Sequence, residues 1–294
     1  MKIAVASEVP AREQNRQRYS PRTGGAMMQM LLEDETSEGF NFRLVRSTFQ
    51  AGEKAFRSPR HRHAFQQVRF TEEGVVNHGP ELNAAQGDIT YFPKAAYYGP
   101  QEKDNGVGIA LQFGYNGEHQ MGDAWVEYRD KAVELLNQTG KIEDGVYVGV
   151  DPETGEKFRE DAVQAIYEKQ YELKTGKKFV VPPEGYQAPI LMHPDAFNYF
   201  DYAPNVKMKV LGRFYDQPGP EGDISIFLIK MSKGGKFTFR PERAQTAWAL
   251  SSGLEIEGKA YPERTFIYSP KGEAGEMSCT DEIEIYAIEF PDPA

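Results

Sequence analysis

Residues 60–70 read RHRHAFQQVRF and place two histidines two positions apart. In a β-strand, residues at i and i+2 point to the same side of the sheet, so His61 and His63 present both imidazoles to one point. The same strand face continues through Phe65, Gln67 and Arg69. Because a buried core strand rarely carries an amide and a guanidinium, this pattern predicts the polar lining of a cavity.

Short alternating segments surround this stretch and predict a β-rich unit up to about residue 120. Residues 40–53, FNFRLVRSTFQAGE, form the first clear strand pattern. The segments GDITYFP and GVGIALQFG follow the histidines, and turns containing Gly, Pro or Asn separate them. Strands at such short and regular spacing are typical of a sandwich or a barrel.

The sequence period changes between about residues 121 and 177. Apolar residues spaced by three and four predict amphipathic helices over 122–137 and 159–175, with Gly140 and Gly176 as their stops. Strand patterns return after this part and continue to the end of the chain. The sequence therefore predicts a mainly β protein with a helical insertion. Its three expected domains are residues 1–120, 121–177 and 178–294.

The histidine segment resembles the first sequence motif of the cupin superfamily, G-x5-H-x-H-x3–4-E-x6-G. His61 and His63 fit the two histidine positions, Gln67 fits the position of the third ligand, and Gly74 fits the last glycine. Ala55 stands where the opening glycine is expected. The first motif is therefore kept in spacing but changed at two of its residues.

The second cupin motif, G-x5-P-x-G-x2-H, follows with larger departures. Gly87 and Pro93 match it, whereas Ala95 replaces its second glycine and Tyr98 replaces its histidine. The resemblance covers about residues 35–118. It implies a small antiparallel barrel of the jelly-roll type with a site inside.

The third part of the chain resembles a second cupin barrel whose ligands are gone. Pro241 and Arg243 stand at the positions of the histidine pair, and Gly275 stands at the histidine of the second motif. None of these side chains donates to a cation, so we expect no metal in this barrel. The whole chain resembles a bicupin of two antiparallel jelly-roll barrels, and is closest to bicupins without an assigned activity.

The resemblance implies a metal held by three histidines and one glutamate. At those positions this chain supplies His61, His63, Gln67 and Tyr98, with a divalent transition metal (Fe, Mn, Ni or Zn) as the expected cofactor. Two imidazoles, an amide and a phenol bind such an ion more weakly than a set that includes a carboxylate. In a straight strand Gln67 lies roughly 13 Å from His63, so a bend or bulge must bring it back.

Three functions stay open for this site. A mononuclear-metal oxygenase would hold a small organic substrate and O₂ at the open positions of the metal. A metal-free isomerase, lyase or cyclase would use His61, His63 and Tyr98 as general acid and base, since histidine titrates near neutrality. A small-molecule binding protein would perform no chemistry. The candidate substrate contacts are Phe65, Arg69 and Tyr91.

Ordinary structural roles compete with some of these assignments. Arg69 either clamps a substrate carboxylate or forms a structural salt bridge. His78, His119 and His193 have no partner at a useful spacing, which indicates loop or surface histidines. Cys279 is the single cysteine, so no disulfide forms within the chain and nothing beside it suggests a nucleophile.

Composition narrows the classes of partner. The 294 residues include 34 Lys and Arg against 44 Asp and Glu, which gives a formal net charge of −10. This acidity argues against a nucleic-acid partner, which requires a basic patch. No segment approaches the roughly 18 apolar residues of a membrane span, and the N-terminus lacks the apolar core of a signal peptide. We expect a cytoplasmic protein with a small-molecule substrate and, by analogy with bicupins, a homodimer.

Overall fold

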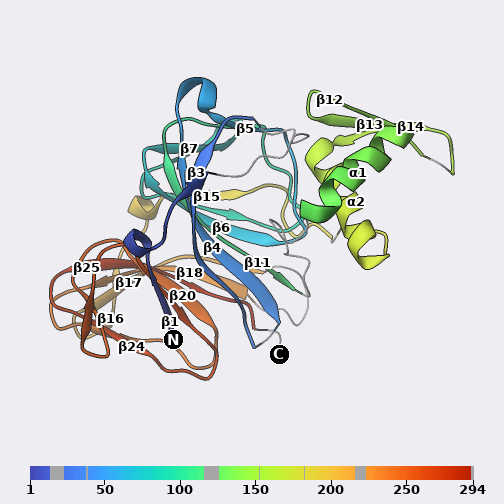
Figure 1. Cartoon of the computed structure of the whole chain (residues 1–294). Coiled ribbons are helices and arrows are strands. Elements are labelled where there is room, and N and C mark those ends of the chain that lie inside the picture. The colour runs from blue at the N-terminus through green and yellow to red at the C-terminus, as the bar shows by residue number, and fades with distance from the viewer. Residues whose placement is uncertain are drawn as a thin grey trace.

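The computed structural model describes residues 1–13, 23–37, 39–115, 126–151, 153–181, 183–215 and 223–292. It is mainly β, with two seven-stranded antiparallel sheets and, in the described part of the chain, two α-helices. Figure 1 shows two β units that lie against each other, with the helices set apart at the outer side of the first unit. The predicted fold class, a mainly β chain with two antiparallel jelly-roll barrels, is confirmed, whereas the insertion that was predicted as helical also contains strands.

The first β unit consists of one large sheet and two strand pairs. The strands of its large sheet are β2 (Arg12–Glu13), β3 (Ala26–Glu35), β4 (Phe40–Phe49), β6 (Gln66–Glu73), β9 (Ile89–Phe92), β11 (Val107–Tyr115) and β15 (Ile190–Met192). Their order across the sheet is β15-β9-β6-β11-β4-β3-β2. The two pairs are β5 (Phe56–Ser58) with β10 (Gln101–Lys103), and β7 (Val75–Gly79) with β8 (Leu82–Ala85).

The second β unit repeats this plan with a large and a small sheet. The strands of its large sheet are β1 (Lys2–Val5), β16 (Phe200–Ala203), β17 (Val206–Tyr215), β18 (Asp223–Met231), β20 (Gln245–Ala249), β23 (Thr265–Ser269) and β25 (Ile283–Glu289). Their order is β1-β23-β20-β25-β18-β17-β16. The small sheet, in the order β19-β24-β21-β22, consists of β19 (Lys236–Thr238), β24 (Glu276–Cys279), β21 (Leu254–Ile256) and β22 (Lys259–Tyr261).

Each β unit takes one strand from the far part of the chain. The first strand, β1, pairs with β23 at the edge of the second sheet. Strand β15, which follows the insertion, pairs with β9 at the edge of the first sheet. The expected domains 1–120 and 178–294 therefore each contribute one strand to the sheet of the other: β1 belongs to the second sheet and β15 to the first.

One apolar core lies between the two large sheets. It combines Val68 and Phe70 of β6 with residues of the second unit such as Trp248 of β20 and Tyr286 of β25. Because strand residues alternate in direction, Gln67 and Arg69 of β6 point the other way, into the first unit. One face of β6 thus packs against the second unit, and its opposite face lines the inside of the first barrel.

The inside of the second barrel is apolar. Its core includes Phe237 and Phe239 around β19, Ile256 of β21, Met277 of β24 and Ile285 of β25. Arg243, at a ligand position of the cupin pattern, has another role. It forms an ion pair with Asp223 at 3.0 Å and donates to the carbonyl oxygen of Phe290 at 2.7 Å.

The insertion is a mixed α/β unit rather than a purely helical one. Its elements are α1 (Val126–Thr139), β12 (Gly140–Glu143), β13 (Val146–Val150), β14 (Lys157–Asp161) and α2 (Ala162–Thr175). The predicted second helix begins three residues too early, because Arg159 belongs to β14. Asp161 caps α2 by accepting from the Gln164 backbone N–H at 3.0 Å, and Gly176 ends it with a φ of 68°, as predicted.

Gly74 shows why the first motif ends in glycine. Its φ is +70°, and an added Cβ would lie 2.9 Å from the backbone oxygen of Asn105. Gly87 has a φ of +91° with nothing within 4 Å of such a Cβ. We expect Gly74→Ala to lower the free energy of unfolding by about 2–3 kcal/mol, and Gly87→Ala by about 1 kcal/mol, because only the first adds a clash to the backbone strain. Urea unfolding of both variants measures this difference, and equal losses would contradict it.

Candidate functional site

A bend at Ala64 and Phe65 separates the histidine pair from strand β6, which begins at Gln66. The segment before the bend pairs with the chain around Tyr98. The His61 backbone N–H donates to the Tyr98 oxygen at 2.9 Å, and the Tyr98 N–H donates back to His61 at 2.9 Å. The bend brings the two histidines and Gln67 to one place, which a straight strand does not allow.

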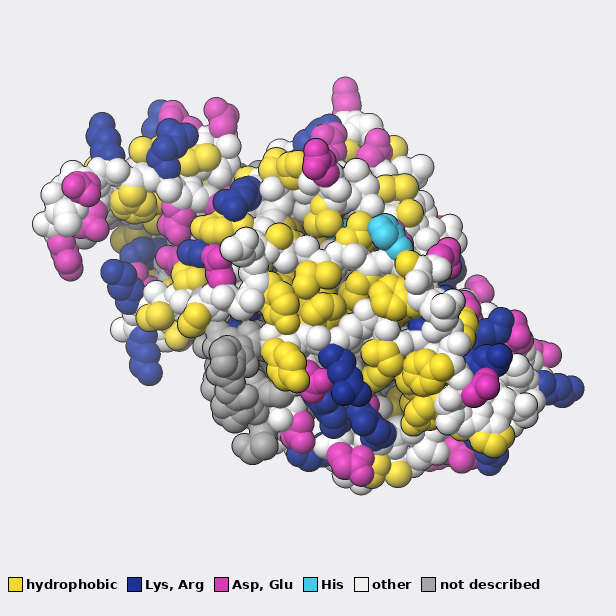
Figure 2. All heavy atoms as spheres, turned by 180° about the vertical axis from the view of Figure 1, so that it is seen from behind, with side chains coloured by type: hydrophobic (Ala, Val, Ile, Leu, Met, Phe, Trp, Pro, Cys, Tyr) yellow, Lys and Arg dark blue, Asp and Glu magenta, His cyan; other side chains and the backbone are white. Residues whose placement is uncertain are grey.

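His61, His63 and Tyr98 form a compact aromatic cluster inside the first barrel. The ring centroids of His61 lie 4.9 Å from His63 and 4.3 Å from Tyr98. His63 stacks on Phe65 at 4.5 Å with an interplanar angle of 15°. The three polar residues are 2–5% exposed. Figure 2 shows one face of the molecule, on which a patch of histidine atoms (cyan) reaches the surface among the described residues.

A backbone carbonyl fixes the orientation of the His61 ring. The Nδ1 atom of His61 lies 2.8 Å from the Pro59 oxygen, and because a carbonyl only accepts, Nδ1 carries the proton. In the neutral ring the lone pair is therefore on Nε2, the nitrogen that is able to take up a proton. Ser58 Oγ also lies 3.4 Å from Nδ1.

Gln67 lies at the centre of a hydrogen-bond network. Its Oε1 accepts from Arg69 Nη2 at 2.7 Å, from Arg69 Nε at 3.2 Å and from Gln112 Nε2 at 2.9 Å. Its Nε2 donates to the Tyr98 hydroxyl at 3.2 Å. The amide is fully buried and satisfied on both atoms, so it links the cluster to β6 and β11.

Arg69 carries a positive charge into this network and meets only neutral groups. It donates to the Tyr98 hydroxyl at 3.3 Å and to His78 Nδ1 at 3.4 Å, and it lies over the Phe92 ring at 4.4 Å. In the described part of the chain Arg69 forms no ion pair, so the alternative of a structural salt bridge is not supported there. Burial, then Lys103, then Arg69 lower the pKa of His78 well below its usual range, and this keeps His78 neutral at pH 7.

Comparison with solved structures identifies the architecture. A candidate dioxygenase of Nostoc punctiforme PCC 73102 superimposes with a TM-score of 0.54 over 99% of this chain and 82% of its own, at 9% sequence identity. An oxalate decarboxylase of Bacillus subtilis, a protein with Mn(II) centres, does so with a TM-score of 0.54 over 99% and 77%, at 13% identity. The chain has a bicupin fold. No family model and no curated protein matches it at the level of sequence.

The four predicted metal ligands form a weak site for a divalent transition metal, because they include no carboxylate. Among the described residues no group of three or more His, Cys, Asp or Glu is placed to hold a metal ion. His61 and His63 are close enough to share one, but the Gln67 oxygen already accepts from Arg69 and Gln112. An ion there would meet two imidazoles, no carboxylate and the fixed charge of Arg69.

The predicted substrate contacts divide between the two faces of the large sheet of the first unit. Phe65 and Arg69 lie in the cluster, against His63 and Tyr98 respectively. Tyr91 does not, because it pairs with Val68 and faces the core between the two units, where its ring stacks on Phe214 at 4.5 Å. Tyr91 therefore lies outside the cluster of His61, His63 and Tyr98, and its contact with a substrate stays a prediction.

Sequence reasoning missed two members of the cluster. His78, expected at the surface, is 1% exposed and contacts Arg69 from β7. Gln112 of β11 pairs with Gln67 across the sheet and donates to its oxygen. The alternation VVNH in β7 was a usable signal, because Val76 and His78 share the inward face. No sequence spacing connects Gln112 to the site, since only strand pairing brings it there.

The remaining histidines lie apart from the cluster. His193 is exposed as expected, but it has a partner, since its Nδ1 lies 2.9 Å from Asp88 Oδ1. His119 lies outside the described residues.

Ala95 explains how the second motif tolerates its changed residue. It has a φ of +64°, the left-handed conformation that suits glycine, and its N–H donates to the His63 oxygen at 2.7 Å. The motif turn is thus kept without its glycine, and it still holds His63.

Neither of the two described helices is long and apolar enough to cross a membrane.

Glu160 makes the junction between insertion and first barrel sensitive to pH. Burial, and then the charge of Glu168 on α2, raise the pKa of Glu160 from 4.5 to about 7. The folded chain therefore holds this proton more tightly than the unfolded chain, and stability falls as pH rises from about 4.5 to about 7. We expect Glu160→Gln to leave the stability unchanged at pH 4. At pH 8 the substitution should raise the free energy of unfolding by about 1 kcal/mol, a value that allows for the partial exposure of the carboxyl.

Thermal unfolding at both pH values measures this effect. Glu156→Gln, on the exposed turn before β14, is the control and should change little at either pH. A Glu160→Gln variant no more stable than the wild type at pH 8 would show that the carboxyl does not oppose folding.

Proposed function

We propose that the first barrel of this bicupin binds a small organic anion at Arg69 and transfers a proton to or from it without a metal. Reactions of this kind belong to isomerases, lyases and cyclases. The observation that carries the proposal is that the Arg69 guanidinium, with no carboxylate partner in the described residues, donates to the hydroxyl of Tyr98, whose ring in turn lies against His61.

Arg69 supplies the binding argument. A partly buried guanidinium without a counter-charge is costly, and a carboxylate from solution offsets that cost with charge-assisted hydrogen bonds. Gln67 and His78 hold the guanidinium from two sides, so its direction is fixed before a ligand arrives. Oxalate, named in the similar decarboxylase, is itself a small organic anion, which agrees with this class of ligand.

His61 and Tyr98 supply the chemistry. With Nδ1 donating to Pro59, the His61 Nε2 lone pair acts as the general base. The Tyr98 hydroxyl accepts from Gln67 and Arg69, so both donors point at the oxygen that becomes negative when Tyr98 gives up its proton. His63, stacked on Phe65, orients the cluster and is the second candidate base.

The binding step is tested by thermal unfolding with acetate, lactate, succinate and oxalate, and with uncharged amides of the same shapes. At least one carboxylate should stabilise the wild type, by about 2.7 kcal/mol at a hundred times its Kd, and Arg69→Met should abolish the shift. Arg213→Met, in the second unit, is the control and should keep it. Equal shifts in the wild type and Arg69→Met would contradict the proposal.

The chemical step is tested with the carboxylate that binds. Turnover followed by NMR should fall by about 10²–10⁴-fold in His61→Ala while binding is retained. Binding without turnover in the wild type would leave the third function, a small-molecule binding protein.

A mononuclear-metal oxygenase is the second candidate function. It is favoured by the 4.9 Å separation of the His61 and His63 rings, which would let both imidazoles reach one ion. Metal analysis of the purified protein and of His61→Ala/His63→Ala decides between the two. Stoichiometric Fe, Mn, Ni or Zn that is lost in the double variant would support the oxygenase and displace the metal-free mechanism.

The assembly and location of the protein belong to the same proposal. We propose a cytoplasmic homodimer that uses the exposed aromatics of the edge strand β16, Phe200 at 46% and Tyr202 at 47% exposure. Light scattering of the purified chain measures the assembly, and a monomeric mass at micromolar concentration would contradict it.

A further inference from the structure

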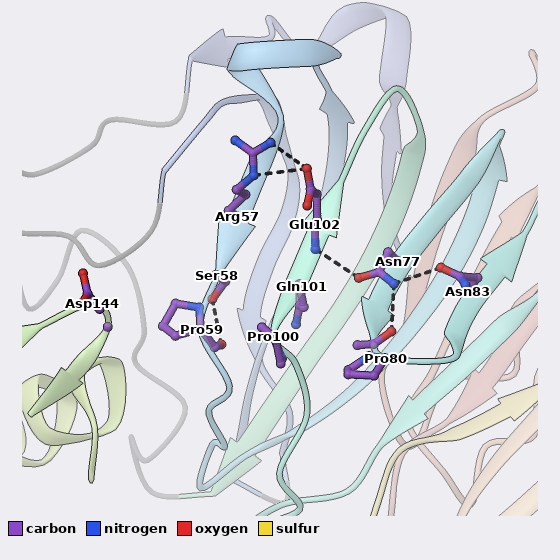
Figure 3. Close-up of a pocket in the computed structure, with 12 residues that line it drawn as sticks. Arg57, Ser58, Pro59, Asn77, Pro80, Asn83, Pro100, Gln101, Glu102 and Asp144 are labelled. Atoms are coloured by element: carbon purple, nitrogen blue, oxygen red, sulfur yellow. Dashed lines mark hydrogen bonds and ion pairs between the residues drawn. The ribbon is translucent and has the colours of Figure 1, made fainter. Parts of the chain in front are cut away.

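A depression of about 640 Å³ lies where the rim of the first barrel meets the turn between β12 and β13 of the insertion. Its volume falls in the range of small-molecule sites. Figure 3 shows the residues around it, with Asp144 of the insertion on one side and Asn77 of β7 on the other. The lining residues used below are Arg57, Pro59, Asn83, Pro100, Gln101 and Glu102.

Gln101 has a side-chain amide without a hydrogen bond in the described structure. The residue is only 4% exposed, and its Nε2 is fully buried with no partner. In Figure 3 it lies in the middle of the lining residues, between Pro100 and Asn77. Asn77 differs, because its amide donates to Gly79 and Asn83 and accepts from the Glu102 backbone. A buried donor without an acceptor is costly, so Gln101 is suited to an acceptor brought by a ligand.

The charges of the depression argue against an anionic ligand. Arg57 and Glu102 form an ion pair at 2.6 Å and cancel each other. Among the described residues that line the depression, Asp144 is the one further charged side chain, so this wall carries no excess positive charge to attract an anion. The apolar part of the wall comes from the rings of Pro59, Pro80 and Pro100.

We propose that this depression binds a neutral polyhydroxylated molecule, a sugar or polyol, whose hydroxyl groups pair with the amides of Gln101 and Asn83. Hydroxyl groups both donate and accept, as carboxamides do, and the C–H faces of a sugar pack on proline rings. This inference stands independently of the anion site. The two sites are neighbours, however, because Pro59 lines the depression and its oxygen accepts from His61.

The insertion contributes one wall of this site. Gly145 lies against Pro59, and a Cβ added to Gly145 would come within 3.0 Å of the proline ring. A ligand in the depression would therefore contact the first barrel and the insertion together, which gives the insertion a role in binding.

The test is an NMR titration of the ¹⁵N-labelled full chain that follows the side-chain NH₂ signals. The probes are glucose, xylose and myo-inositol as neutral compounds, with glucuronate and glucosamine as charged counterparts. At least one neutral probe should shift the Gln101 and Asn83 signals with a Kd in the millimolar range, of order 1–10 mM. Gln101→Leu should weaken that binding at least tenfold, and exposed Gln187→Leu should leave it unchanged.

Stability separates a binding role of Gln101 from a structural one. Gln101→Leu removes an amide without partners, so its melting temperature should equal or exceed that of the wild type. A strongly destabilised variant would show that the amide supports the fold and would overturn the assignment. Two further results would overturn the assignment: no signal shift with any neutral probe at about 50 mM, or shifts with glucuronate alone.

Discussion

Trp248→Ala should lower the free energy of unfolding by about 4 kcal/mol, within the 3–5 kcal/mol typical of a buried tryptophan. Trp248 is 1% exposed in the core between the two large sheets. Its ring stacks on Tyr286 at 5.3 Å and lies 6.0 Å from Phe70 of the first unit. The truncation would leave a cavity at the contact between the two barrels, where neither sheet is free to close it.

Trp248→Phe is the matched control for this prediction. The indole Nε1 is buried without a hydrogen-bond partner among the described residues, so phenylalanine loses volume but no hydrogen bond. We expect a loss of about 1–2 kcal/mol. Urea unfolding of the two variants and the wild type gives the comparison, and equal losses for alanine and phenylalanine would show that the ring is not packed as described.

Glu72→Ala should lower the free energy of unfolding by about 3–4 kcal/mol, because it removes the carboxylate shared by two arginines. Glu72 of β6 is 10% exposed at its side chain, and it accepts from Arg46 Nε at 2.6 Å and from Arg264 Nε at 2.7 Å. Arg264 precedes β23, so this carboxylate joins the two β units. The variant would leave the 15% exposed Arg46 side chain with Glu73 at 4.0 Å as its nearest carboxylate.

Glu73→Ala tests whether burial gives Glu72 this effect. Glu73 also pairs with Arg264, at 2.7 Å, but its side chain is 51% exposed. An exposed ion pair contributes about 0–1 kcal/mol, so the expected loss is several times smaller. Both variants are compared by urea unfolding at low salt, and a Glu73→Ala loss as large as that of Glu72→Ala would refute the argument.

The two barrels of this chain share an architecture and differ in their interiors. The first holds His61, Gln67, Arg69 and His78 inside, whereas the corresponding space in the second is filled by side chains such as Phe239. Because strand alternation and register set the fold, the inward positions of a barrel are free to become polar or apolar. This difference explains why the proposed chemistry is confined to the first barrel.

Local sequence determined the elements of this protein wherever a short-range rule applies. The alternating segments formed strands, and Gly176 ended its helix in the left-handed conformation that glycine adopts without steric cost. The rings of His61 and His63 lie 4.9 Å apart, which agrees with the prediction from their i, i+2 spacing, even though the segment is not a continuous strand. These features depend on residues near one another in the chain, so their pattern is visible without the fold.

Tertiary structure decided which side chains meet. Gln112 lies in the site because β11 pairs with β6 in a register that sets it opposite Gln67. Tyr91 lies outside the site because β9 pairs with β6 in a register that turns it to the other face. The exchange of β1 and β15 between the sheets likewise follows from pairing between distant segments. Whether Arg69 has a carboxylate partner depends on all the strands around it, and for that reason spacing alone left both of its roles open.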